Sequence, residues 1–146
     1  MINPYQLQYK EDLLSIFRLN IPDFFNETEI GDFEYYLEHN SDTYLIIEED
    51  HQVIGGAGYY VNKSDNSGRI TWIFIDPQHA GQGYGTQAVE YCLKELRDNL
   101  KVEKFVVTTS QKSFKFFAKF GFQVVHTQKD YWGEGLDLYE MKLFAL

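Results

Sequence analysis

Three glycines within five positions mark the segment of this sequence whose spacing best suits chemistry. Gly81, Gly83 and Gly85 follow the apolar run ITWIFI (70–75) and precede a helical pattern. A strand that feeds a glycine-rich turn and then a helix presents backbone N–H groups, together with the positive end of the helix dipole, to an anion. The segment therefore indicates an anion-binding loop, and it leaves open which anion the loop holds.

Two common phosphate-binding motifs fail at their key residues. A dinucleotide fingerprint that starts at Gly81 needs a third glycine at position 86, where the chain has Thr86. A nucleoside-triphosphate loop ends in Gly-Lys-Ser/Thr, and this loop contains no lysine. A glycine turn without a ligand is a third interpretation, although three spaced glycines that open an amphipathic helix exceed what a turn requires.

The elements that must position this loop alternate as in a mixed α/β sheet flanked by helices. The expected order is β-α-α-β-β-β-α-β-α-β-β. Strands are expected over 2–7, 43–48, 52–61, 69–75, 104–110, 122–128 and 136–144. Helices are expected through 13–17, from 26, after the glycines as far as Leu100, and over 111–120.

Local signals refine several of these elements. Asn26 can cap the second helix while Glu29 reaches back to it, as in a capping box. Cys92 shares the apolar face of the third helix and is expected in the core, and Gly121 is expected in the left-handed conformation that ends the fourth. The glycines of the strand 52–61 indicate that something presses closely against it.

Composition sets limits on the function. The length of 146 residues is typical of one domain, and a formal net charge of −9 argues against nucleic acid or an anionic membrane as the main partner. The charge suits a cationic acceptor, although excess acid also keeps a protein soluble. No signal-peptide core or membrane-spanning run is visible, so a cytoplasmic protein is expected. The four histidines lack ligand spacing, so no metal is expected, and the many aromatic residues permit a homodimer.

Two segments resemble a known family. IDPQHAGQGYGTQAVEYCLKEL (75–96) resembles the central motif of the GNAT family of N-acetyltransferases, in which Pro, a glycine-rich pyrophosphate loop and a helix follow a strand. SQKSFKFFAKFGF (110–122) resembles that family's Asn-x-x-Ala-x-x-Phe-Tyr-x-x-x-Gly-Phe segment, and VIGGAGYY (53–60) precedes both. The resemblance implies a mostly antiparallel, twisted sheet of six to seven strands with four helices, forming a single acetyltransferase domain over residues 1–146.

The resemblance also implies a cofactor and a reaction. Acetyl-coenzyme A would be the co-substrate, its pyrophosphate held by the loop and its pantetheine arm paired with the strand before it, in a V-shaped gap beside the strand 104–110. An acetyl group would pass to a primary amine of a small molecule by direct attack. The implied cofactor-binding residues are Phe74, Ile75, Gln78, Gly81, Gln82, Gly83, Tyr84, Gly85, Thr86, Ser110 and Phe117.

Three departures from the family pattern bear on this function. Ala80 stands where Arg or Gln is usual, so Gln78 or Gln82 would substitute for its phosphate contact. Ser110 replaces Asn and can cap the following helix or bond the pantetheine. Phe117 replaces a Tyr whose hydroxyl protonates the thiolate, which raises the alternative of a coenzyme A-binding module with weak or lost catalysis.

Candidate catalytic groups follow from what the reaction needs. Tyr131 and Tyr139 could supply the missing proton, or the thiolate could leave unaided, because a free thiol has a pKa of roughly 8.5. Asp76 and Glu134 are candidate bases for the acceptor ammonium, and each also has a plain structural interpretation, as a turn residue or an exposed loop charge. A row of basic residues could contact the cofactor's 3′-phosphate or form a solvated helix face; it consists of Lys112, Lys115 and Lys119. His79 could contact phosphate or only solvent.

Overall fold

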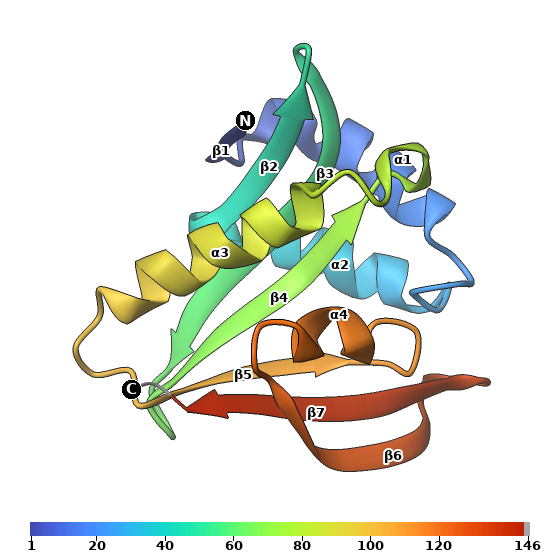
Figure 1. Ribbon diagram of the computed structural model, residues 1–146. Helices are drawn as coiled ribbons and strands as arrows, with labels where there is room; N and C mark the ends of the chain where they lie inside the picture. Colours follow the sequence, from blue (N-terminus) through green and yellow to red (C-terminus); the bar gives the residue numbers. More distant parts are fainter. Residues whose placement is uncertain (145–146) are drawn as a thin grey trace.

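The computed structural model describes residues 1–144, so the last two residues of the expected domain lie outside the described residues (Figure 1). The strands are β1 (Ile2–Pro4), β2 (Tyr44–Glu49), β3 (Gln52–Asn62), β4 (Ser67–Ile75), β5 (Lys104–Thr109), β6 (Gln123–Gly133) and β7 (Leu136–Phe144). The α-helices are α1 (Lys10–Leu19), α2 (Glu29–His39), α3 (Tyr84–Arg97) and α4 (Phe114–Ala118). Single 3₁₀ turns lie at Leu7–Tyr9, Ser41–Thr43 and Pro77–His79. The expected order of strands and α-helices is confirmed.

One seven-stranded sheet runs through the described residues in the order β1-β2-β3-β4-β5-β7-β6. Every neighbouring pair is antiparallel except β4 and β5. That parallel pairing is confined to Ser67–Arg69 against Lys104–Val106. Beyond it the two strands diverge and leave the V-shaped opening that the family resemblance implied (Figure 1).

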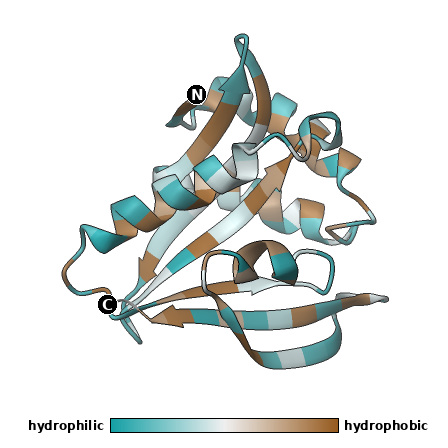
Figure 2. Ribbon diagram, viewed as in Figure 1, coloured by the Kyte–Doolittle hydropathy of each residue, from teal (hydrophilic) through white to brown (hydrophobic). Residues whose placement is uncertain are grey.

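The sheet has a hydrophobic core on each face. Along β2, Leu45 and Ile47 pack into the cluster that holds α3, whereas Tyr44 and Ile46 pack into the cluster that holds α1 and α2. Because side chains alternate across a strand, burial on both faces explains the continuous apolar run of β2. Figure 2 shows α3 banded with hydrophilic and hydrophobic residues, as expected for a helix that covers one face of a sheet.

Three local predictions are confirmed, and the expected capping box forms its two hydrogen bonds just ahead of the helix, because α2 begins at Glu29 with Thr28 as its N-cap residue. Asn26 Oδ1 accepts a hydrogen bond from Thr28 N at 3.0 Å, and Glu29 Oε2 accepts one from Asn26 N at 2.8 Å. Cys92 is fully buried, and Gly121 has a φ of 101°. What presses against the glycines of β3 is the Tyr44 ring of β2, together with Tyr36 of α2 and the β4 backbone.

Three helix boundaries differ from the prediction, and the first is the start of α2, which lies at Glu29 instead of Asn26. Leu100 is 99% exposed and lies beyond α3, because Asn99 accepts a hydrogen bond from Lys101 N at 2.9 Å in a local turn that competes with the helix. The helix expected over 111–120 is shorter, because a turn begins at Ser110, whose hydroxyl accepts from Lys112 N at 3.2 Å. The first strand also ends early, at Pro4. Within residues 1–144 no helix combines the length and apolar character needed to cross a membrane.

Candidate functional site

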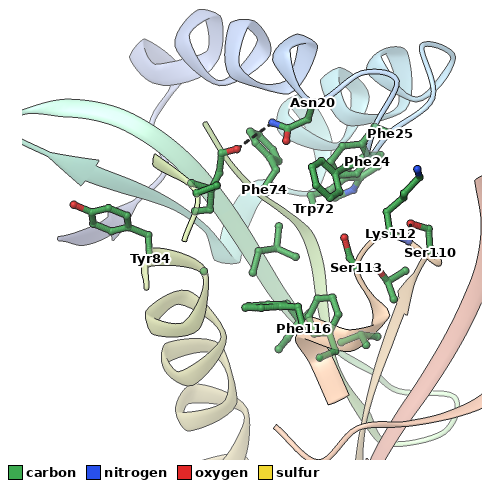
Figure 3. A pocket seen from close by; sticks show the side chains of 18 of the residues that line it. Asn20, Phe24, Phe25, Trp72, Phe74, Tyr84, Ser110, Lys112, Ser113 and Phe116 are labelled. Atoms are coloured by element: carbon green, nitrogen blue, oxygen red, sulfur yellow. Dashed lines mark hydrogen bonds between the residues drawn. The ribbon is translucent and has the colours of Figure 1, made fainter. Parts of the chain in front are cut away.

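A cavity of about 700 Å³ occupies the opening between β4 and β5. Its walls come from the glycine loop and the start of α3, from β4 and β5, from the segment that enters α4, and from the connection between α1 and α2. Figure 3 shows Tyr84 at one side of this space, with Phe24, Phe25 and Trp72 together at another and Phe116 below. The cavity therefore joins the glycine loop to an aromatic region formed by the α1–α2 connection and β4.

The glycine loop keeps its N–H groups free of protein acceptors. Gly81 and Gly83 have φ values of 77° and 89°, a left-handed conformation that favours glycine, and open space surrounds both. The first backbone bond of α3 runs from Gln87 N to Gly83 O at 3.0 Å. Among the described residues, no carbonyl or side chain accepts from the N–H groups of residues 81–86. A row of donors at a helix N-terminus is thus left available to an anion in the cavity.

A 3₁₀ turn holds the approach to this loop. Asp76 accepts a hydrogen bond from Gln78 N at 2.9 Å and so caps the turn. His79 lines the cavity, with Nε2 at 3.3 Å from Glu49 Oε2 and Nδ1 at 3.9 Å from Asp76 Oδ2. A hydrogen bond to Glu49, aided by burial, raises the pKa of the Tyr84 hydroxyl. Asp76 thus serves the turn and is not among the cavity-lining residues.

A β-bulge shapes the β4 wall of the cavity. Gly58 pairs with Thr71 and Gly56 with Phe74, so β4 carries one extra residue between these pairs, and Trp72 has a φ of 49°. Beyond the bulge, Asn20 Nδ2 donates a hydrogen bond to Ile75 O at 3.2 Å and ties α1 to the end of β4. The bulge and this bond fix the strand where a thioester arm would lie.

Aromatic side chains gather at one side of the cavity, away from Tyr84 at the start of α3 (Figure 3). Phe25 and Trp72 stack with ring centroids 6.2 Å apart, and Phe24 lies beside them (Figure 3). Trp132 lines the same cavity, and its indole Nε1 donates to Thr109 O at 3.0 Å. A side chain at position 133 would overlap the Asn26 side chain, so the α1–α2 connection and the β6–β7 hairpin touch there.

Glu29 brings a carboxylate to this aromatic end. It is 7% exposed and lines the cavity. Burial raises the pKa of the Glu29 carboxyl to about 7, against the opposing effect of the hydrogen bond from Asn26 N, and nearby Asp32 adds to the increase. The sequence had marked Glu29 only as a capping residue. Because segments far apart in the sequence form the cavity, no local pattern could have shown that Glu29 also lines it.

Most of the expected cofactor-binding residues do line the cavity. They are Phe74, Ile75, Gly81, Gly83, Tyr84, Gly85, Thr86, Ser110 and Phe117. Gln78 and Gln82 are not among the lining residues. Lys112 and Lys119 line the cavity, whereas Lys115 does not.

The structure does not bring the expected catalytic residues into the cavity. Tyr131 is 52% exposed and packs edge-on against Trp132. The Tyr139 ring lies on Phe114, with centroids 4.8 Å apart, and Glu134 is exposed in the β6–β7 turn. None of these three residues lines the cavity, and Asp76 does not line it either.

Comparisons with known proteins agree with this architecture. A family model described as the acetyltransferase (GNAT) family matches residues 11–122. No curated protein sequence matches the chain.

Several solved structures share the fold. A ribosomal-protein-alanine N-acetyltransferase from Brucella melitensis is 20% identical, with a TM-score of 0.79 and 99% of each chain covered. An N-acetyltransferase from Staphylococcus aureus Mu50 is 19% identical, with a TM-score of 0.77 and coverage of 99% of this chain and 97% of that one. An aminoglycoside 6′-N-acetyltransferase complexed with coenzyme A is 13% identical, with a TM-score of 0.77 and coverage of 99% and 96%. At these identities the likeness establishes the fold.

Proposed function

We propose, from the premise that this chain belongs to the acetyltransferase (GNAT) family, that it moves an acetyl group from acetyl-coenzyme A to the primary amine of a small molecule. The supporting observation is the row of unpaired N–H groups at residues 81–86, which opens on the cavity between β4 and β5. A pyrophosphate needs such a row of donors, and the dipole of α3 adds to the attraction.

The residues present fit coenzyme A along the whole cavity. The loop donors suit the pyrophosphate, and Gly81 and Gly83 have no neighbouring atoms that would keep phosphate away. The end of β4 at Phe74 and Ile75 lines the part of the opening where β5 no longer pairs with it, which suits an extended amide-bearing arm. Lys119 lines the cavity as a cation for a phosphate. The fit supports acetyl-coenzyme A as the co-substrate.

The chemistry requires little beyond alignment and polarisation. Acetyl-coenzyme A, when bound, supplies an activated acetyl thioester. A backbone N–H near Ile75 would polarise the carbonyl, and the aromatic end would exclude water and orient the amine. Phe117 offers no proton to the departing thiolate, which at a pKa of roughly 8.5 can leave without one.

Two measurements test this function. Calorimetric titration of the protein with acetyl-coenzyme A should give one binding site, and incubation with acetyl-coenzyme A and amines should release free thiol. Binding without thiol release from any amine would favour the alternative of a coenzyme A-binding module without catalysis. Failure to bind acetyl-coenzyme A would refute both the acetyltransferase and the coenzyme A-binding module.

A further inference from the structure

The acceptor end of the cavity combines one carboxylate with several aromatic rings. Glu29 is the only acidic residue among the described residues that line the cavity. Within the proposed function, on which this inference rests, we propose that Glu29 holds the acceptor's ammonium and takes its proton. We further propose that the acceptor is a monoamine with an aromatic or alkyl body, which packs among Phe24, Phe25, Trp72 and Trp132.

The position of Glu29 suits both tasks. Its Oε2 is engaged by Asn26 N, and among the described residues no hydrogen bond and no cation within 4.0 Å engages Oε1. A carboxylate that is 7% exposed and unpaired with a cation is costly to keep ionised. A bound ammonium would supply the missing counter-charge, so the structure holds a site that a cation completes.

The other ionisable groups around Glu29 do not supply the counter-charge that the acceptor's ammonium would bring. Asp32, on the same helix, is an acid and favours the protonated form of Glu29. Lys112 and Lys119, from the segment around α4, line the same cavity without forming an ion pair with Glu29, and His79 and Tyr84 line it beside the glycine loop. Burial holds the pKa of Glu29 near the operating pH, as a base for an ammonium requires.

The walls restrict the body of the acceptor. Phe25, Trp72 and Trp132 offer ring faces and edges to an apolar group, and an ammonium gains from nearby ring faces. A second or third cation on the acceptor would meet Lys112 or Lys119 and find no further carboxylate among the described lining residues. Asn26 lies against Gly133, so a peptide that entered between the α1–α2 connection and the β6–β7 hairpin would have to separate them. A monoamine is therefore favoured over a polyamine or a peptide.

The reaction balances with Glu29 as the first proton acceptor. The ammonium loses one proton to the Glu29 carboxylate and becomes a neutral amine. The nitrogen lone pair forms a bond to the acetyl carbon, the carbon–sulfur bond breaks, and sulfur keeps its electron pair. The nitrogen then releases its second proton, which the thiolate or water takes, and Glu29 returns its proton to solvent. The products are one N-acetylated amine, one free thiol and one proton.

Glu29→Gln tests the role of the carboxylate with little structural change. The glutamine amide oxygen can still accept the hydrogen bond from Asn26 N, but glutamine cannot take a proton. With phenylethylamine as the acceptor, kcat/KM at pH 7 should fall by about 10²- to 10³-fold. The deficit should shrink as pH rises, because free amine then reaches the site already deprotonated. Glu27→Gln is the matched control, since it removes the same charge from an exposed side chain two positions away and should leave kcat/KM unchanged.

Further readouts separate this inference from the proposed function. Affinity for acetyl-coenzyme A should be the same in Glu29→Gln and the wild type, which shows that the variant folds and binds. In the wild type, phenylethylamine should be acetylated with a higher kcat/KM than spermidine or an alanine-led hexapeptide. That comparison needs no variant.

Three outcomes would overturn the inference. Full activity of Glu29→Gln at pH 7, or a preference for spermidine or the peptide, would refute it while leaving acetyl transfer intact. Binding of acetyl-coenzyme A without thiol release from any of the three amines would refute this inference and favour a coenzyme A-binding module over the proposed function.

Discussion

The hydroxyl of Tyr44 on β2 donates a hydrogen bond to the carbonyl oxygen of Trp72 at 2.8 Å, at the bulge of β4. The Tyr44 ring lies against Gly56 and Gly58, where any side chain would collide with it. The absence of side chains at Gly56 and Gly58 therefore leaves space for the Tyr44 ring. The hydroxyl of that ring binds the bulge that borders the cavity.

Tyr44→Phe keeps the ring and removes this bond. The Trp72 carbonyl would lose its donor at a part-buried position, at a cost of about 0.5–1.5 kcal/mol in the free energy of unfolding. Urea denaturation measures this cost. Tyr60→Phe, at a side chain that is 44% exposed, is the control and should change stability by less than about 0.5 kcal/mol. Equal stability of the two variants would contradict a structural role for the bond.

Gly83→Ala should weaken binding of acetyl-coenzyme A. A φ of 89° strains any residue with a Cβ by about 1–2 kcal/mol, so the loop would move to relieve the strain and misplace its N–H groups. Gly31→Ala, in α2 with open space around it, is the control and should raise stability by about 0.5–1 kcal/mol. Calorimetry and thermal unfolding measure the two effects. Unchanged affinity in Gly83→Ala would count against the loop as the pyrophosphate site.

Phe117→Tyr should raise kcat. Phe117 lines the cavity and is 4% exposed, and the family resemblance implies a Tyr at this position whose hydroxyl protonates the thiolate. The gain should be largest below the thiol pKa and smaller than the roughly 10²-fold typical of a general acid, because the thiolate already leaves unaided. Thiol release between pH 6 and 9 measures it. A kcat that stays the same, with intact acetyl-coenzyme A affinity, would mean that thiolate departure does not limit turnover.

Glu29 should make stability depend on pH. Its carboxyl pKa is about 7 in the folded state against 4.5 for an ordinary glutamate, so the folded protein binds this proton more tightly than the unfolded chain. The resulting stability is fully present below pH 4.5 and is lost as pH rises through 7. With screening by water in the cavity, the loss should be about 1–2 kcal/mol. Urea denaturation at pH 5 and pH 8 should show this loss of stability in the wild type and not in Glu29→Gln. An equal loss in both proteins would contradict the role of Glu29.

Cys92 should not react with thiol reagents in the native protein. The side chain is fully buried, and burial raises the pKa of the thiol to about 12, so little thiolate forms or meets solvent. Titration with a colorimetric disulfide reagent should detect one thiol per chain only after denaturation. Reaction of the native protein at the denatured rate would contradict this burial. The result also decides whether thiol release can be measured without a background from the protein.

Local patterns were enough to predict the elements and a glycine loop whose N–H groups are left free for an anion. Glycine spacing before an amphipathic helix, the Asn26–Glu29 cap and the alternation of apolar residues act over a few residues, so the linear sequence contains them. They predicted the element order and the mixed sheet, and the family resemblance implied most of the residues that line the loop end of the cavity.

The acceptor end of the cavity was decided by the tertiary structure. Bulges in β6 shift its register, so alternation could not reveal that Trp132, and not Tyr131, faces the cavity. Glu29 became a buried carboxylate beside aromatic rings only because α2 packs next to β4 and the β6–β7 hairpin meets Asn26. A pKa depends on how far water is excluded from a group, and that exclusion comes from segments far apart in the sequence.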